Sequence, residues 1–165
     1  MKILLRAFRE SDFDAFHAIV SDFDVVKMTS SWPFPAEEEF TRMRMNTPEA
    51  KAGLVNVIDV DGDFAGTIGC VNGGLGYMLS QAYWGRGIMT RAVTLKLKQC
   101  FADPELDQAT ACVWHDNPAS ARVLEKVGFK SAFTCKDYCK ARDAEMDAIH
   151  YKLSRADWRR LDGAS

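Results

Sequence analysis

The chain has 165 residues, of which 47% are hydrophobic and 27% are charged, and its formal net charge at pH 7 is −2. This length predicts one domain, residues 1–165, with a hydrophobic core of ordinary size. The weak net charge gives no reason to expect nucleic acid or an anionic membrane as a partner.

The beginning of the chain, residues 1–6, holds no apolar run long enough for a signal peptide, and no stretch approaches the roughly 20 apolar residues of a membrane span. We therefore expect a cytoplasmic protein. The five cysteines form no CxxC pair. Cys135 and Cys139 can share one face of a strand, but two ligands do not make a zinc site. We expect buried, reduced thiols and no metal.

The N-terminal third predicts one strand, residues 2–8, and two helices. Ser11 and Asp14 have the spacing of a capping box at the start of the first helix. Pro35, which is followed by an alanine and three glutamates, predicts the start of the second helix. The expected buried residues are Phe13, Phe16, Ile19 and Val20 in the first helix and Phe40, Met43 and Met45 in the second.

The middle of the chain predicts three strands in succession, residues 54–60, 64–71 and 75–80. Asp-Gly-Asp and Asn-Gly-Gly turns separate them. A helix then runs to about residue 101, and residues 109–115 alternate as a fifth strand.

The last third begins with Asn117-Pro118, a favoured helix start, and Gly128 ends that helix. Two more strands, residues 130–138 and 145–153, precede a short terminal helix. The order is therefore β-α-α-β-β-β-α-β-α-β-β, which predicts an α/β (α+β mixed) fold with helices on both faces of a mixed sheet.

Two glycines stand where the strand at residues 75–80 gives way to the following helix, in the segment Trp84-Gly-Arg-Gly-Ile-Met-Thr90. Glycine lets the backbone approach a ligand closely and adopt angles that other residues avoid. The first amides of a helix have no internal partner and lie at the positive end of its dipole. This turn therefore predicts an anion site, most naturally for a phosphate.

Two common phosphate-binding motifs do not fit this turn. A Walker A loop requires Gly-Lys-Ser/Thr at its end, and only Arg86 is present here. A dinucleotide fingerprint requires three glycines after the first strand, whereas this turn supplies two, followed by Thr90, far from the N-terminus.

The segment Trp84-Gly-Arg-Gly-Ile-Met89 resembles the Gln/Arg-x-x-Gly-x-Gly/Ala loop of the GNAT family of N-acetyltransferases, which binds the pyrophosphate of acetyl-coenzyme A. The segment from Asn117 to Phe129 is similar to the second motif of that family, and the element order matches along nearly the whole chain. Both motifs and residues 5–12 are most similar to the branch that includes the ribosomal-protein N-terminal alanine and serine acetyltransferases. The resemblance implies a single GNAT-like domain, a mostly antiparallel, twisted sheet of about seven strands, and acetyl-coenzyme A as cosubstrate.

The chain departs from the family pattern at four positions. Trp84 stands where Gln or Arg is common, and Met89 where Gly or Ala is common. Leu124 replaces the tyrosine with which many members protonate the departing thiolate. Gly74 replaces a glutamate that many members carry. Both the usual acid and the usual base are therefore missing from their usual places.

The resemblance implies that the backbone amide of Leu79 faces the thioester oxygen, where residues 77–80 and 111–114 splay apart. We expect Ser120 to protonate the departing thiolate and Asn117 to bond to the pantetheine; their plain alternatives are a first-turn serine and a helix cap. The expected cofactor-binding residues are Met78, Leu79, Ser80, Gly85, Arg86, Gly87, Ile88, Met89, Thr90 and Asn117.

Trp32 and Phe34 are expected to line the acceptor pocket. Because no strong base is in its usual place, an α-amine with a pKa near ~8 suits the site better than a lysine near ~10.4. The expected acceptor is a primary amine of a protein N-terminus or of a small amino compound, and the chain is expected to be a monomer or a homodimer. Two alternatives stay open: a non-catalytic acyl-coenzyme A sensor of the same fold, and a nicotinamide-dependent oxidoreductase.

Overall fold

The computed structural model describes residues 1–163, which contain one seven-stranded sheet in the order β1-β2-β3-β4-β5-β7-β6. Neighbouring strands are antiparallel except for β4 and β5, which are parallel. The predicted mixed, mostly antiparallel sheet is therefore confirmed. The strands are β1 (Ile3–Arg6), β2 (Val55–Val60), β3 (Asp63–Val71), β4 (Gly74–Leu79), β5 (Gln108–Trp114), β6 (Lys130–Cys139) and β7 (Ala144–Ser154).

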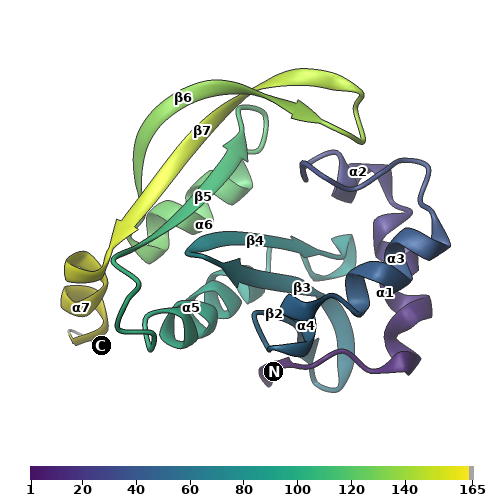
Figure 1. Cartoon of the computed structure of the whole chain (residues 1–165), viewed down its shortest axis with the longest axis horizontal. Coiled ribbons are helices and arrows are strands. Elements are labelled where there is room, and N and C mark those ends of the chain that lie inside the picture. The colour runs from purple at the N-terminus through teal and green to yellow at the C-terminus, as the bar shows by residue number, and fades with distance from the viewer. Residues whose placement is uncertain (164–165) are drawn as a thin grey trace.

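Helices cover both faces of the sheet, as predicted (Figure 1). On one face the main core joins α5, α6 and α7 to the strands, and on the other a cluster around Phe16, Trp32 and Met78 seats α1, α2 and α3. The helices are α1 (Phe13–Val20), α2 (Phe23–Val26), α3 (Glu38–Met45), α4 (Pro48–Lys51), α5 (Ile88–Cys100), α6 (Pro118–Val127) and α7 (Arg155–Gly163). Within residues 1–163, no helix combines the length and apolarity needed to cross a membrane.

The predicted cap at Ser11 is wrong. Ser11 lies inside a 3-10 turn, Glu10–Asp12, and the residue that organises the entry to α1 is Asp12. Its carboxylate accepts hydrogen bonds from the Arg6 guanidinium at 2.8 and 2.9 Å and from the Arg9 amide at 2.7 Å. Burial alone raises the pKa of Asp12, but these bonds hold it below its usual range. A buried ion pair thus replaces a serine cap.

The region between α1 and β2 also differs from expectation. The short helix α2 is additional, and α3 begins at Glu38 rather than at Pro35, which follows Phe34 through a cis peptide bond. Met43 is exposed, so its predicted burial is wrong, whereas Met45 is buried. The buried residues of α3 are Thr41 and Met45, four residues apart on one side of the helix.

The prediction that all five cysteines are reduced is wrong in this structure. Cys70 of β3 and Cys100 at the end of α5 form a disulfide, because packing of α5 on the sheet brings their Cα atoms within 6.6 Å. Of the remaining three, Cys139 is buried and Cys112 is exposed.

Lys96 of α5 is buried, and its hydrogen-bond partners within residues 1–163 are neutral groups. Its side chain donates to the Asn56 side chain at 2.7 Å and to the Gly53 carbonyl at 3.0 Å, and the residue is 2% exposed. Burial lowers the pKa of Lys96 to about 8.

This pKa predicts a pH dependence of stability. The folded protein releases the Lys96 proton near pH 8, whereas the unfolded chain holds it until about pH 10.4. Folding is therefore relatively favoured as pH rises through this window. Urea unfolding of wild type and Lys96→Met at pH 7.5 and 9 is expected to show a larger stability gain with pH in the wild type. An equal change in the free energy of unfolding between pH 7.5 and 9 in the two proteins would contradict the lowered pKa of Lys96.

Candidate active site

The sheet opens between its two parallel strands. β4 and β5 are paired at one position, Gly74 with Thr110, and then diverge, which confirms the predicted splay. A cavity of about 660 Å³ lies on the side of α5 and α6, and a second of about 500 Å³ on the side of Trp32. Tyr77 and Cys112 line both cavities, so the two meet at the gap in the sheet.

The glycine turn forms one end of the first cavity. Gly85 and Gly87 have φ of +70° and +73°, and a Cβ added at either would meet nothing within 4 Å. Glycine is therefore needed there for its backbone angle, and the space above the turn is open to a ligand. Gly87 is the N-cap of α5 and makes no side-chain cap hydrogen bond. The cavity lining includes Gly85, Arg86, Gly87, Ile88, Met89 and Thr90.

The residues at this turn fit a diphosphate. The first turn of α5 offers its amides and the positive end of its dipole to an anion. Arg86, Arg122 and Lys126 also line the cavity and add positive charge. Acetyl-coenzyme A carries such a diphosphate, and the cavity leads from the turn to the gap between β4 and β5.

The orientation of Leu79 follows from the ladder between β3 and β4. The amide of Ser80 donates to the Ala65 carbonyl of β3 at 2.8 Å. Because successive residues of a strand direct their amides to opposite edges, the amide of Leu79 points toward β5 and the gap. Its carbonyl accepts from the Trp84 indole at 2.8 Å, which links the end of β4 to the glycine turn.

Ser120 and Tyr77 meet inside the first cavity. Their hydroxyl oxygens lie 2.6 Å apart, and both residues line the cavity. Ser120 is held by the start of α6, where the Asn117 side chain accepts from its amide at 3.2 Å. Burial raises the pKa of Tyr77 to about 12, against the opposing hydrogen bond with Ser120. The phenol therefore stays protonated at neutral pH.

Sequence reasoning did not select Tyr77. Leu124 is fully buried on the cavity wall, at the place where the family resemblance puts a tyrosine. Tyr77 reaches the same cavity from β4 instead. The signal available in the sequence was the hydroxyl of a tyrosine at the first residue of the strand segment predicted to splay, residues 77–80.

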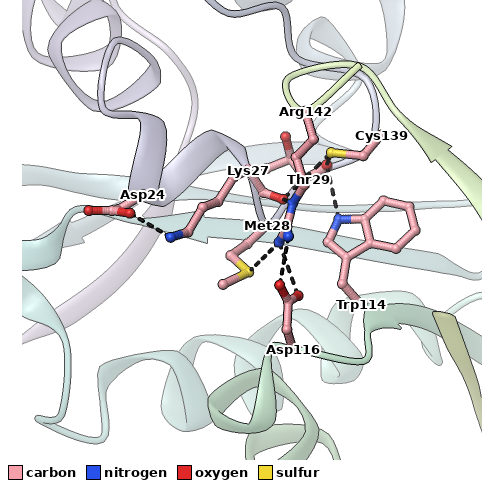
Figure 2. Close-up of polar contacts among 8 residues, drawn as sticks. All are labelled: Asp24, Lys27, Met28, Thr29, Trp114, Asp116, Cys139 and Arg142. Carbon is pink, nitrogen blue, oxygen red and sulfur yellow. Dashed lines mark hydrogen bonds and ion pairs between the residues drawn. The ribbon is translucent and has the colours of Figure 1, made fainter. Parts of the chain in front are cut away.

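A clamp of Arg142, Asp116 and Lys27 joins three segments around the gap (Figure 2). Arg142, in the β6–β7 turn, donates to the Asp116 carboxylate at 2.6 and 3.0 Å and to the Lys27 carbonyl at 2.8 Å. Beside it, the Trp114 indole donates to the Thr29 carbonyl at 3.2 Å. The hairpin tip thereby holds α2 and the loop after β5 at the cavity mouth.

Removing the clamp is expected to destabilise the fold. Arg142→Ala removes a partly buried guanidinium and its two hydrogen bonds to the Asp116 carboxylate, and it is expected to lower the free energy of unfolding by about 1.5 kcal/mol at pH 7. The hydrogen bond from Arg142 lowers the pKa of Asp116 below its unfolded value near ~3.9. The contribution is therefore present above that value and is lost as pH falls through the lower folded pKa.

Urea unfolding of wild type and Arg142→Ala at pH 7 and 3 measures this contribution. The difference in free energy of unfolding between the two proteins is expected to be smaller at pH 3 than at pH 7. Lys98→Ala, which breaks an exposed pair with Asp162 at 3.7 Å, serves as control and is expected to change stability by less than about 0.5 kcal/mol. An Arg142→Ala effect as small as the control would contradict the clamp.

The other predicted site residues differ in which cavity they line. Met78, Leu79 and Asn117 line the first cavity, and Trp32 lines the second. Ser80 is not among the described residues that line the first cavity. Phe34 is not among those that line either one, and it packs on Phe23 with ring centroids 4.9 Å apart.

Comparison with known proteins identifies the class of fold. Residues 2–130 match the family model described as "Acetyltransferase (GNAT) domain". The chain is 26% identical over 84 residues to the putative ribosomal N-acetyltransferase YdaF of Bacillus subtilis, an alignment that covers 51% of this chain and 46% of that relative. The first curated relatives are thus matched over less than half of their own length.

Two further alignments extend the similarity to nearly the whole chain. The uncharacterized N-acetyltransferase p20 of Bacillus licheniformis is 25% identical over 169 residues, covering 95% of each chain. A solved structure of RimL, titled a ribosomal L7/L12 alpha-N-protein acetyltransferase in complex with coenzyme A, superposes with a TM-score of 0.76 at 22% identity. It covers 93% of this chain and 94% of that one.

Proposed function

The chain belongs to the acetyltransferase (GNAT) family, and we propose that it transfers the acetyl group of acetyl-coenzyme A to the α-amine of a protein N-terminus by direct attack. The observation that carries this proposal is the path from the glycine turn, through the first cavity, to the hydroxyl pair of Ser120 and Tyr77 at the gap. Membership of the family favours an enzyme over an acyl-coenzyme A sensor or a nicotinamide-dependent oxidoreductase.

Acetyl-coenzyme A supplies an acetyl group activated as a thioester, and the residues of this chain bind and polarise it. The amides from Gly87 to Thr90 bind the diphosphate, with Arg86 beside them. Asn117 borders the pantetheine path. The Leu79 amide, directed into the gap, donates to the thioester oxygen and stabilises the negative charge that develops there.

Ser120 and Tyr77 complete the chemistry. The Ser120 hydroxyl donates its proton to the departing sulfur, and the Tyr77 hydroxyl donates to the Ser120 oxygen behind it. The proton that the amine loses as the amide bond forms passes to solvent water, and the Ser120–Tyr77 pair regains a proton from solvent. One proton therefore leaves the acceptor, one ends on the sulfur, and both hydroxyls are restored. The Leu124 side chain has no proton to donate, so the Ser120–Tyr77 pair supplies the proton in place of the family's usual tyrosine.

The second cavity is poorly suited to a polycation. Asp137 is the one carboxylate among the described residues that line it, Arg44 lines it too and offsets that charge, and Trp32, Trp114 and Tyr138 supply aromatic walls. A polyamine carries several charges and is poorly matched by one carboxylate. An α-amine is already about a tenth neutral at pH 7, so it needs no strong base. YdaF and RimL, by their names, also belong to the ribosomal branch.

Thiol release with three acceptors tests the proposal. The first acceptor is a peptide with a free N-terminal alanine or serine, the second is the same peptide with a blocked N-terminus and an internal lysine, and the third is spermidine. The kcat/KM of the first is expected to exceed that of each of the other two at least about tenfold. Faster turnover of spermidine would overturn the choice of acceptor. Coenzyme binding without turnover of any amine would favour the sensor instead.

The setting of the protein completes the proposal. We propose a cytoplasmic location, where acetyl-coenzyme A and nascent chains are present, and a monomer or a homodimer in which the exposed edge strand β6 pairs. Cys70 and Cys100 are bonded in this structure, but disulfides are uncommon in that compartment, so we expect the bond to be reduced in cells. Mass measurement of alkylated protein from cells is then expected to show both residues as free thiols. A bonded pair would argue for another compartment.

A further inference from the structure

We propose that the chain binds Zn²⁺ through Cys112, Cys135, Asp137 and His150, on the face of the sheet that borders the second cavity. The three strands β5, β7 and β6 bring these residues together. Cys112 of β5 lies directly opposite His150 of β7. Across the next ladder His150 is opposite Phe133 of β6, so Cys135 and Asp137, two and four residues further on, lie on the same face.

The donor atoms already lie near one another. One ligand atom from each of Cys112, Asp137 and His150 lies within 4.8 Å of the other two. The Cys135 sulfur is 3.1 Å from His150 Nε2 and 3.7 Å from an Asp137 oxygen, and that oxygen is 3.7 Å from Nε2. Ligands of a tetrahedral zinc ion lie about 3.3–3.8 Å apart, given metal–ligand bonds of about 2.0–2.3 Å. The donors of Cys135, Asp137 and His150 are therefore already at about ligand spacing, and the Cys112 thiol completes the set by a side-chain movement toward them.

The donor chemistry selects the metal. Two thiolates, one imidazole and one carboxylate form a tetrahedral set that suits zinc, whereas oxygen-preferring ions such as Mg²⁺ or Ca²⁺ find one carboxylate only. The two thiols release their protons on binding. The His150 ring is stacked on Phe133, with centroids 4.4 Å apart and an interplanar angle of 11°, and in this orientation its Nε2 lies 3.1 Å from the Cys135 sulfur.

The position of the site gives it a structural consequence. Cys112 and Asp137 also line the second cavity, so a bound ion forms part of that wall. The ion also connects β5 to the edge strand β6 across β7. We therefore expect bound Zn²⁺ to raise the melting temperature of the chain.

Titration of reduced, metal-free protein with Co²⁺, followed by Zn²⁺, tests the site. One equivalent of Co²⁺ is expected to give the visible bands of a tetrahedral ion and a thiolate charge-transfer band, and Zn²⁺ is expected to displace it. Cys135→Ser and Cys112→Ser are each expected to remove about half of the charge-transfer intensity. His150→Gln is expected to retain that band but to weaken Zn²⁺ binding by at least about tenfold.

Cys139→Ser is the matched control. Cys139 is on the same strand as Cys135, but its thiol donates to the Thr29 carbonyl, so this variant is expected to bind metal like the wild type. The proposal is overturned if no charge-transfer band forms, if Cys139→Ser loses as much intensity as Cys135→Ser, or if His150→Gln binds Zn²⁺ as tightly as the wild type. These readouts do not depend on acetyl transfer.

Discussion

Replacing Ser120 by alanine is expected to lower kcat about 100-fold while KM for acetyl-coenzyme A changes less than about twofold. The variant loses the hydroxyl that protonates the sulfur, but it keeps the glycine turn that binds the diphosphate. The Asn117 side chain accepts from the backbone amide of residue 120, so α6 keeps its cap. Thiol release at saturating acetyl-coenzyme A and peptide measures the effect. An unchanged kcat would place the acid elsewhere.

Tyr77→Phe tests whether the two hydroxyls act as one unit. It is expected to lower kcat about tenfold, since the Ser120 oxygen loses the donor behind it. The double variant is expected to be no slower than Ser120→Ala, whereas independent roles would give the product of the two effects. Tyr151→Phe, which removes a hydroxyl bonded to Glu125 at 3.2 Å outside the cavity, is the control and is expected to retain kcat.

Replacing Gly87 by alanine is expected to raise KM for acetyl-coenzyme A about 10- to 100-fold. The residue has φ of +73°, a conformation that costs an L residue about 1–2 kcal/mol, and relaxation would turn the first amides of α5 away from the diphosphate. Initial rates at varied acetyl-coenzyme A measure the change.

Gly62→Ala is the matched control for that variant. Gly62 has φ of +98° in the β2–β3 turn, and a Cβ there also meets nothing within 4 Å, so the backbone strain is comparable. Because the turn lies away from both cavities, its KM is expected to stay at the wild-type value. Equal KM changes in the two variants would mean that lost stability, rather than a lost phosphate contact, is the cause.

The sequence predicted most of the fold because its signals are local. Alternating strands, the Asp-Gly-Asp turn and the two glycines before α5 are each encoded within a few residues. The glycine turn was found for the same reason. The Ser11 cap failed because the neighbouring Asp12 organises the entry to α1 instead: its carboxylate accepts from the Arg9 amide and from the Arg6 guanidinium at the end of β1.

The rest of the site depends on long-range register. Tyr77 and Ser120 are 43 residues apart, and nothing near either residue indicates that they touch. Cys135 and His150 meet only because β6 pairs with β7 with a shift between Ser131 and Phe133. A spacing rule applied to Cys135 alone finds one cysteine neighbour and no metal site. The disulfide likewise required the packing of α5 on β3.

A crystal structure of the protein with coenzyme A tests the central claim most directly. The account predicts diphosphate oxygens within hydrogen-bond distance of the backbone amides between Gly87 and Thr90, with the thiol end in the gap between β4 and β5 beside Ser120. A diphosphate bound elsewhere on the chain, with the amides at the start of α5 facing solvent, would contradict it.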